Sequence, residues 1–260
     1  MPAPNRGRAG IESLWLVRHG ESAGNVARDR AEQQGLHTIE LVGRDIDVPL
    51  SPLGERQSRA LGRWLNALDP EQKPTVVLTS PYVRARRTAE LLIDEGHLHH
   101  PQLVFVSDER LREKEFGSLN RFTKLGITTR FPHEAALRAE IGKFYYRPPG
   151  GESWCDVLLR LRSLMDHIEL RYAGERVLIV AHQVTVLCFR FLLEELDEQR
   201  ILAIDREKDV ANCSVTRFEK GVGPGVRESL RLEAYNFVAP LEAAGEPITR
   251  QPDAPGAAKA

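Results

Sequence analysis

Residues 14–25 read LWLVRHGESAGN. The apolar run that opens this stretch ends at Arg18, and the small and polar residues that follow suit a tight turn and the start of a helix. The pattern predicts a buried strand that carries an arginine and a histidine to the loop at its end. The guanidinium of Arg18 suits phosphate oxygens, and the imidazole of His19 can act as a nucleophile. A simpler interpretation is that both side chains only cap the strand, so the rest of the chain must decide.

Length and charge limit the classes of protein to consider. The chain has 260 residues, of which 42% are hydrophobic, enough for the core of one large α/β domain. The 36 lysines and arginines nearly balance 37 aspartates and glutamates, so a net charge of −1 predicts neither nucleic acid nor a membrane as a partner. Three widely spaced cysteines are typical of reduced thiols and indicate a cytoplasmic protein. The oligomeric state stays open.

Short apolar, β-branched runs alternate with amphipathic stretches along the chain. This alternation predicts an α/β fold of three layers (α/β/α), in which helices cover both faces of a mostly parallel sheet. The clearest helix follows Ser153, where apolar residues recur at helical spacing up to residue 168. The expected strands, the last two of which should pair at or near a sheet edge, lie at residues 14–17, 75–79, 103–106, 176–181, 214–218 and 230–235.

Cationic and imidazole side chains follow three of the expected strand ends. Arg18 and His19 follow the first strand, Ser80 and Arg84 follow the second, and His182 follows the strand at 176–181. Ligands bind at the carboxyl ends of the strands in such a sheet, so these residues can converge although they are far apart in sequence. Two guanidiniums and two imidazoles at one edge predict a site for an anion such as phosphate.

The stretch LREKEFG at residues 111–117 adds carboxylates to this set. A charged stretch of this kind is commonly a solvated loop. Alternatively, Glu113 or Glu115 can supply the proton that a departing alkoxide needs. With His19 as nucleophile, either glutamate would complete a site for phosphoryl transfer.

Five motifs, in this order, resemble those of the histidine phosphatase superfamily, the phosphoglycerate mutase-like proteins. They are LVRHGES with Asn25, TSPYVRARRTA, LRE followed by FG, GES before a helix, and VAH, at residues 16–25, 79–89, 111–117, 151–153 and 180–182. The resemblance runs from about residue 14 to residue 218. It implies the phosphoglycerate mutase-like form of the three-layer fold.

The resemblance also implies roles for individual residues. His19 would attack phosphorus and form a phosphohistidine that water later hydrolyses, and Glu113 would protonate the leaving oxygen, with Glu115 the weaker candidate. The implied catalytic set is His19, Glu113, His182, Arg18 and Arg84. The implied ligands of the substrate's phosphate are Arg18, Asn25, Arg84, His182 and Gln183. Two guanidiniums and a second imidazole would hold the phosphate charge, so neither a metal ion nor a cofactor is implied.

Two departures from the glycolytic mutases of this family favour hydrolysis. Gly24 precedes Asn25 where those mutases have tryptophan, and His182 is followed by QVT where they have Gly-Asn-Ser. The His-Gln pair is more similar to the phosphatase branches. We therefore expect a metal-independent phosphomonoesterase that acts on a small phosphorylated metabolite. The alternatives are a cofactor-dependent phosphoglycerate mutase and a noncatalytic phosphate-binding or interaction module on the same fold.

We divide the chain into a flexible N-terminus at residues 1–12, a histidine phosphatase catalytic domain at 13–238 and a disordered tail at 239–260, which is rich in Ala, Pro and Gly. Residues 117–149 are locally basic, show only a patchy helix pattern and are expected to form a lid-like insertion. Tyr145, Tyr146 and Arg147 in this insertion could contact a second anionic group or a base. Packing of the two tyrosines on the core is the simpler interpretation.

Overall fold

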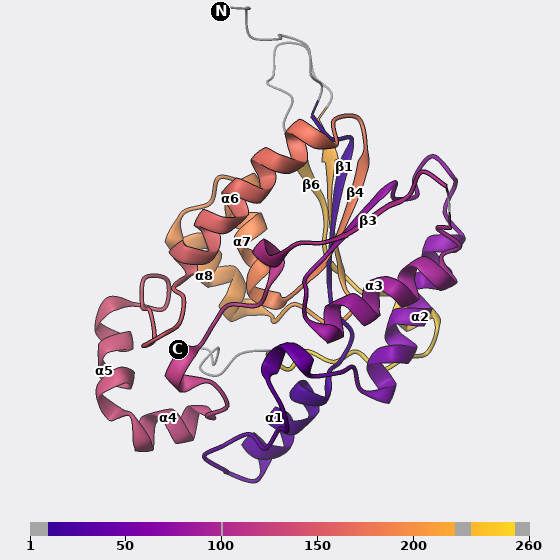
Figure 1. Cartoon of the computed structure of the whole chain (residues 1–260). Coiled ribbons are helices and arrows are strands. Elements are labelled where there is room, and N and C mark those ends of the chain that lie inside the picture. The colour runs from indigo at the N-terminus through magenta and orange to yellow at the C-terminus, as the bar shows by residue number, and fades with distance from the viewer. Residues whose placement is uncertain (1–9, 100, 222–229, 253–260) are drawn as a thin grey trace, which may run out of the picture.

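The computed structural model describes residues 10–99, 101–221 and 230–252, which form a six-stranded sheet with the strand order β3-β2-β4-β1-β5-β6 (Figure 1). The first four strands along the chain run parallel, whereas β5 pairs antiparallel with β1 and β6 pairs antiparallel with β5 at one side of the sheet. The predicted mostly parallel sheet and the pairing of the last two strands at its edge are confirmed. The strands are β1 (Ser13–Arg18), β2 (Val76–Thr79), β3 (Val104–Ser107), β4 (Arg176–Ala181), β5 (Val215–Lys220) and β6 (Leu230–Phe237).

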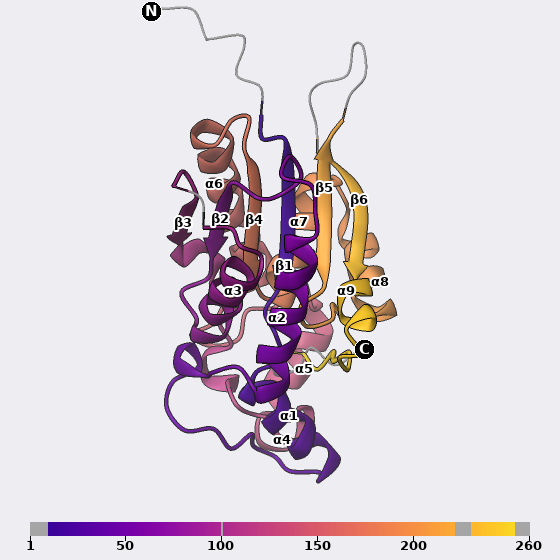
Figure 2. The same ribbon diagram turned by 90° about the vertical axis from the view of Figure 1, so that its right-hand side faces the viewer.

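Each face of the sheet carries its own core, because successive strand residues point to opposite faces. Leu14 and Leu16 of β1 belong to one core, and Trp15 and Val17 belong to the other. Figure 2 looks onto the second face. Within the described ranges, no helix is long and apolar enough to cross a membrane. The covering helices are α6 (Trp154–Arg171), α7 (Gln183–Leu193) and α8 (Glu198–Glu207) on the first face, and α2 (Pro52–Asn66), α3 (Val83–Glu95) and α9 (Ala239–Ala243) on the second.

Short-range signals set where the two longest helices begin. The Ser51 hydroxyl accepts a hydrogen bond from the backbone N–H of Gly54 (3.0 Å), and a proline occupies the first helical position of α2. At α6, the Ser153 hydroxyl accepts from the N–H of Asp156 (3.2 Å), whose carboxylate accepts from the N–H of Ser153 (2.8 Å). Such caps satisfy N–H groups that have no partner inside the helix, and each contributes about 1 kcal/mol.

The insertion lies beyond the carboxyl end of the sheet. It contains α4 (Lys124–Arg130) and α5 (Pro132–Ile141), which lie with α1 (Ala23–Gln33) at the lower end of the molecule in both views (Figures 1 and 2). A small apolar cluster around Ile127 and Tyr146 packs inside it. The helix pattern was only patchy in the sequence because α5 buries none of its residues and so has no apolar stripe.

The fold extends beyond the limits predicted for the main domain. Ile11 is buried and the N–H of Glu12 donates to the carbonyl of Glu175, so the predicted flexibility is wrong for residues 10–12. The predicted disorder is wrong for residues 239–252, where α9 is followed by a segment that packs back on the protein. The Ala, Pro and Gly content of this tail hid two apolar side chains, Leu241 and Ile248, that join the core beside α2. The remaining terminal residues, 1–9 and 253–260, lie outside the described residues.

Candidate active site

Strand β1 brings His19 to the carboxyl end of the sheet. The N–H of His19 donates to the carbonyl of Ala181 at the end of β4 (3.0 Å), which ties the two strand ends together, and the imidazole is fully buried. Nδ1 of His19 lies 2.7 Å from the carbonyl oxygen of Gly20. A carbonyl only accepts, so in the neutral ring Nδ1 carries the proton and Nε2 keeps the lone pair. The ring is thus held in the tautomer that makes Nε2 the nucleophilic atom.

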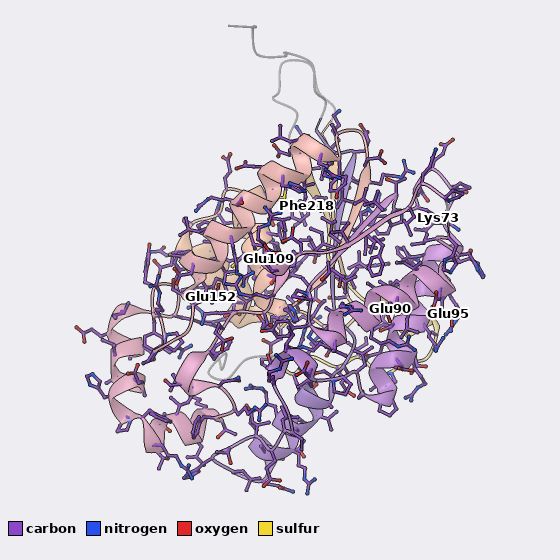
Figure 3. The ribbon with its side chains drawn as sticks, viewed as in Figure 1. Lys73, Glu90, Glu95, Glu109, Glu152 and Phe218 are labelled. Carbon is purple, nitrogen blue, oxygen red and sulfur yellow. The ribbon has the colours of Figure 1, made fainter. Side chains whose placement is uncertain are left out.

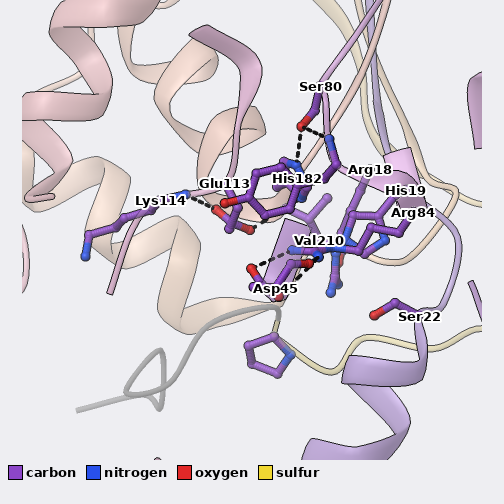
Figure 4. A network of polar contacts seen from close by, with 12 residues as sticks. Arg18, His19, Ser22, Asp45, Ser80, Arg84, Glu113, Lys114, His182 and Val210 are labelled. Carbon is purple, nitrogen blue, oxygen red and sulfur yellow. Dashed lines mark hydrogen bonds and ion pairs between the residues drawn. The ribbon is translucent and has the colours of Figure 1, made fainter. Parts of the chain in front are cut away.

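A second imidazole, that of His182, follows β4 and lies beside the first (Figure 4). The ring centres of His19 and His182 are 5.2 Å apart, and the ring centre of Tyr82 lies 5.1 Å from that of His182. Nε2 of His182 lies 2.8 Å from the Ser80 hydroxyl, and its Nδ1 lies 3.8 Å from Oε2 of Glu113. Residues from three separate motifs therefore meet at the second histidine.

The structure separates the two candidate acids. Glu113 is buried, and its Oε1 accepts a hydrogen bond from the N–H of Lys114 (2.6 Å) while Oε2 faces the second histidine. The carboxylate of Glu115 instead accepts from the N–H groups of Phe116 and Gly117 (3.0 Å each) and stabilises the local turn. Glu113 is therefore the glutamate that faces the second histidine.

Glu152, in the GES motif, holds the loop that carries the acid. Its Oε1 accepts from Arg112 (2.5 Å) and Arg160 (3.0 Å), and its Oε2 accepts from the N–H of Glu115 (3.1 Å). Figure 3 shows Glu152 just before α6. Sequence analysis found the motif but gave it no task; the structure shows that it fixes the position of the stretch containing Glu113.

Arg18 and Asn25 converge on one backbone oxygen. Both side chains donate to the carbonyl of Gln251, Asn25 through Nδ2 at 3.0 Å and Arg18 through Nη2, and Arg18 also donates through Nη1 to the carbonyl of Val210 (2.5 Å). Oδ1 of Asn25 accepts from the N–H of Ser22 (2.9 Å), which orients the amide. The donors meet as an anion site requires, but in this structure a carbonyl oxygen of the tail faces them. Sequence analysis did not predict this contact, because the tail was expected to be disordered.

Arg84, near the start of α3, is bound by Asp45. Its Nη1 and Nη2 lie 3.2 Å from Oδ1 and Oδ2 of Asp45, and Nη1 donates to the Asp45 carbonyl at 2.8 Å. The guanidinium lies 4.7 Å from the centre of the Tyr82 ring. Sequence analysis missed Asp45, which lies in a short 3-10 turn within a polar stretch without periodicity. Its carboxylate partly neutralises the cation that was predicted to bind phosphate.

A cavity of about 180 Å³, here named the side pocket, is lined by residues of the insertion and by residues that follow Glu113 and His182 in the chain. Lys114 and Gln183, which directly follow Glu113 and His182 in the chain, both line it. Gln183, which was predicted to bind phosphate, is therefore a lining residue of the side pocket. Its Nε2 donates to Oδ1 of Asp209 (3.0 Å). The apolar wall of the pocket is formed by Phe116, Leu119, Ile127, Pro148, Trp154 and Val184.

The arrangement has the groups for phosphoryl transfer. An imidazole in a fixed tautomer, a second imidazole and a buried carboxyl group lie together, with donors of two guanidiniums at the same edge of the sheet. Among the residues that the structure describes, no group of three or more His, Cys, Asp or Glu side chains is arranged to hold a metal ion.

Comparisons with known proteins agree on one family. The sequence profile of the histidine phosphatase superfamily (branch 1) matches residues 14–227. A protein of Schizosaccharomyces pombe named as a probable fructose-2,6-bisphosphatase is 34% identical over 176 residues, which are 68% of this chain but 36% of that protein. A protein of Yersinia enterocolitica named as a probable phosphoglycerate mutase is 27% identical over 88% of this chain and 94% of its own length.

Solved structures show the same fold. A mycobacterial glucosyl-3-phosphoglycerate phosphatase in complex with VO3 superposes with a TM-score of 0.66 at 26% identity, covering 87% of this chain and 99% of the other. A Bacillus stearothermophilus protein, YhfR, superposes with a TM-score of 0.67 at 26% identity over 88% and 98% of the two chains. The predicted phosphoglycerate mutase-like fold is confirmed. With the profile matching most of its length, the chain belongs to the histidine phosphatase superfamily.

Proposed function

We propose that this protein hydrolyses a small phosphomonoester through a phosphohistidine formed on Nε2 of His19, with no metal ion taking part. The observation that carries the proposal is the hydrogen bond from Nδ1 of His19 to the carbonyl of Gly20 (2.7 Å), which leaves the lone pair on Nε2 inside a buried site. Glu113 lies beside the second histidine, where it can serve as acid and base.

The reaction has two steps. In the first, Nε2 of His19 attacks phosphorus while the ester P–O bond breaks, and the carboxyl group of Glu113 gives its proton to the leaving oxygen. In the second, Glu113 takes a proton from a water molecule, whose oxygen attacks phosphorus as the P–N bond breaks. Inorganic phosphate leaves and the imidazole returns to its starting state.

The nonbridging oxygens need cationic or neutral donors throughout the transfer. Arg18, Arg84 and His182 supply charge and Asn25 adds a neutral donor. Arg18 and Asn25 can bind phosphate only after the carbonyl of Gln251 has moved away from them. Arg84 can bind phosphate only after it has separated from the Asp45 carboxylate. We assign Gln183 to the leaving-group side, because it lines the side pocket.

The relatives support hydrolysis of a small phosphorylated compound. Their names describe phosphatases of fructose 2,6-bisphosphate and of glucosyl-3-phosphoglycerate. The Yersinia relative named as a mutase keeps isomerisation of phosphoglycerate as the second candidate. An assay of that isomerisation, with and without a bisphosphorylated primer, distinguishes the two activities. A noncatalytic module has no need of the buried His19 and Glu113.

The test is release of inorganic phosphate from a panel of phosphomonoesters in the presence of a chelator. We expect activity in the wild type, none in His19→Ala, and wild-type activity in His99→Ala, whose exposed ring lies beside Asp94 on the surface. Quenching with alkaline detergent during turnover should trap a phosphoprotein that is stable to alkali, labile to acid and absent in His19→Ala. Undiminished hydrolysis by His19→Ala, or loss of activity on chelation, would overturn the proposal.

A further inference from the structure

The side pocket has the size and lining for one ring. Its volume is about 180 Å³, and an apolar cavity of about 150 Å³ in another protein holds benzene. Phe116 and Trp154 contribute aromatic surface, and Ile127 of α4 reaches it from the insertion. A pocket lined mainly by apolar side chains with a few charged groups is the usual form of a site that binds an organic group.

The residues that line the side pocket include more cations than carboxylates. Four cations line it, namely Lys114, Lys124, Arg138 and Lys143, against two carboxylates, Glu134 and Asp205. Lys143 forms an ion pair with Asp205, and Glu134 accepts a hydrogen bond from the Tyr146 hydroxyl (2.6 Å). The excess positive charge favours an anionic occupant.

One of these cations, Lys114, is held away from water, and Arg138 lies close enough for its charge to act on it. The Lys114 side chain is only 6% exposed, and its ammonium lies 4.1 Å from the centre of the Phe116 ring. Burial lowers the pKa of Lys114 to about 8; the charges of Glu113 and Glu152 oppose this shift, and the charge of Arg138 adds to it. Burial also lowers the pKa of Arg138. An anion that entered between them would stabilise the charged form of both side chains.

The tyrosines and arginine first considered for a second anion have other contacts. Tyr146 is buried against Glu134, and Arg147 forms an ion pair with Asp156 (Nε to Oδ2, 2.7 Å) at the surface. Tyr145 is 55% exposed. These contacts leave the recognition of a second anion to the cationic side chains of the pocket.

We propose that the side pocket binds the leaving group of the substrate, and that this group is a single ring bearing an anionic substituent held by Lys114 and Arg138. The inference rests on the proposed function, because it places the scissile phosphate between the histidines and Glu113. Lys114 and Gln183, which line the pocket, directly follow Glu113 and His182 in the chain, so the pocket lies next to the two segments that carry these reacting groups. Lys114 and Arg138 would then determine specificity without touching phosphorus.

The test compares three phosphate esters of primary alcohols: 4-carboxybenzyl phosphate, its neutral analogue 4-carbamoylbenzyl phosphate, and the ringless 3-(phosphonooxy)propanoate. The first two differ in one charge at nearly constant size. We expect the wild type to prefer the carboxylate over the amide by at least about tenfold in kcat/KM, mainly through KM. The ringless anion should be the poorer substrate of the two carboxylates.

Variants then assign the preference. In Lys114→Met and Arg138→Met we expect the ratio between carboxylate and amide to fall to about threefold or less, whereas Lys114→Arg should retain most of it. Lys73→Met is the matched control, because this lysine lies at the opposite end of the strands, beside Asn66 (Figure 3), and it should keep the full ratio.

The outcomes separate the inference from the proposed function. Hydrolysis of carboxylate and amide at equal rates, lost in His19→Ala, would overturn the inference and leave the phosphatase proposal standing. A preference that survives both Met variants would likewise overturn it. If neither benzyl ester nor any other phosphomonoester is hydrolysed in a manner that depends on His19, both proposals fail.

Discussion

Replacement of Asp45 by asparagine tests whether this carboxylate competes with phosphate for Arg84. Asp45 contacts the guanidinium at two points of 3.2 Å and holds a negative charge where phosphate oxygens are expected. Asp45→Asn removes the charge and keeps the shape, and the backbone carbonyl of residue 45 can still accept from Arg84 at 2.8 Å. We expect phosphate to bind more tightly to the variant.

The size of the effect follows from the burial of the two partners. A hydrogen bond to a charged group contributes about 1.5–3 kcal/mol when buried. The Arg84 side chain is 2% exposed but that of Asp45 is 33% exposed, so screening by solvent reduces the contact to about 1 kcal/mol. Because about 1.4 kcal/mol corresponds to a tenfold change in an equilibrium constant, the Kd of phosphate should fall about fivefold.

Calorimetric titration with inorganic phosphate measures this Kd, and product inhibition gives an independent value. Asp47→Asn is the matched control: Asp47 lies two residues away and pairs with the exposed Arg44 (2.7 Å), so its loss should leave phosphate binding unchanged. Weaker phosphate binding in Asp45→Asn would refute the reasoning, because it would mean that the carboxylate orients Arg84 rather than competing for it.

Three further predictions concern the fold. Leu241→Ala should lower the free energy of unfolding by about 2–5 kcal/mol, because this side chain is fully buried; a loss below about 0.5 kcal/mol in urea titration would show that the tail adds nothing to stability. Gly54→Ala should lower the melting temperature and the activity together, since a Cβ there would lie 1.9 Å from the carbonyl oxygen of Glu21, in the loop after His19, and equal melting temperatures would contradict this packing. The pKa of Lys114 is about 8 in the fold against 10.5 for a free lysine, so between pH 8 and 10.5 the unfolded chain binds more protons and the stability of the wild type should rise with pH. Lys114→Met should be free of this rise, which amounts to at most about 3 kcal/mol, and parallel stability profiles of the two proteins would disprove the shift.

The proposed catalytic residues could be predicted from local patterns. Each strand that carries one of these residues is a short apolar run in the sequence. The residue that ends such a run lies at the carboxyl edge of the parallel sheet, regardless of which strands pair with each other. His19, Ser80 and His182 therefore meet as a consequence of strand ends that are readable in the sequence. The choice between Glu113 and Glu115 needed coordinates, because both lie in one charged loop and only its backbone path decides which carboxylate turns toward the second histidine.

The sequence by itself determined the strands, the helix caps and the residues that stand at the strand ends, because these depend on side-chain periodicity and on hydrogen bonds between near neighbours. The tertiary structure alone decided that Asp45 binds Arg84, that the Gln251 carbonyl faces Arg18, and that Lys114 lines a pocket with Arg138. These contacts join loops and a tail that have no periodicity of their own. Their positions are set by which distant surfaces they can bury, as Leu241 does in the core beside α2, and that depends on the assembled fold rather than on neighbouring residues.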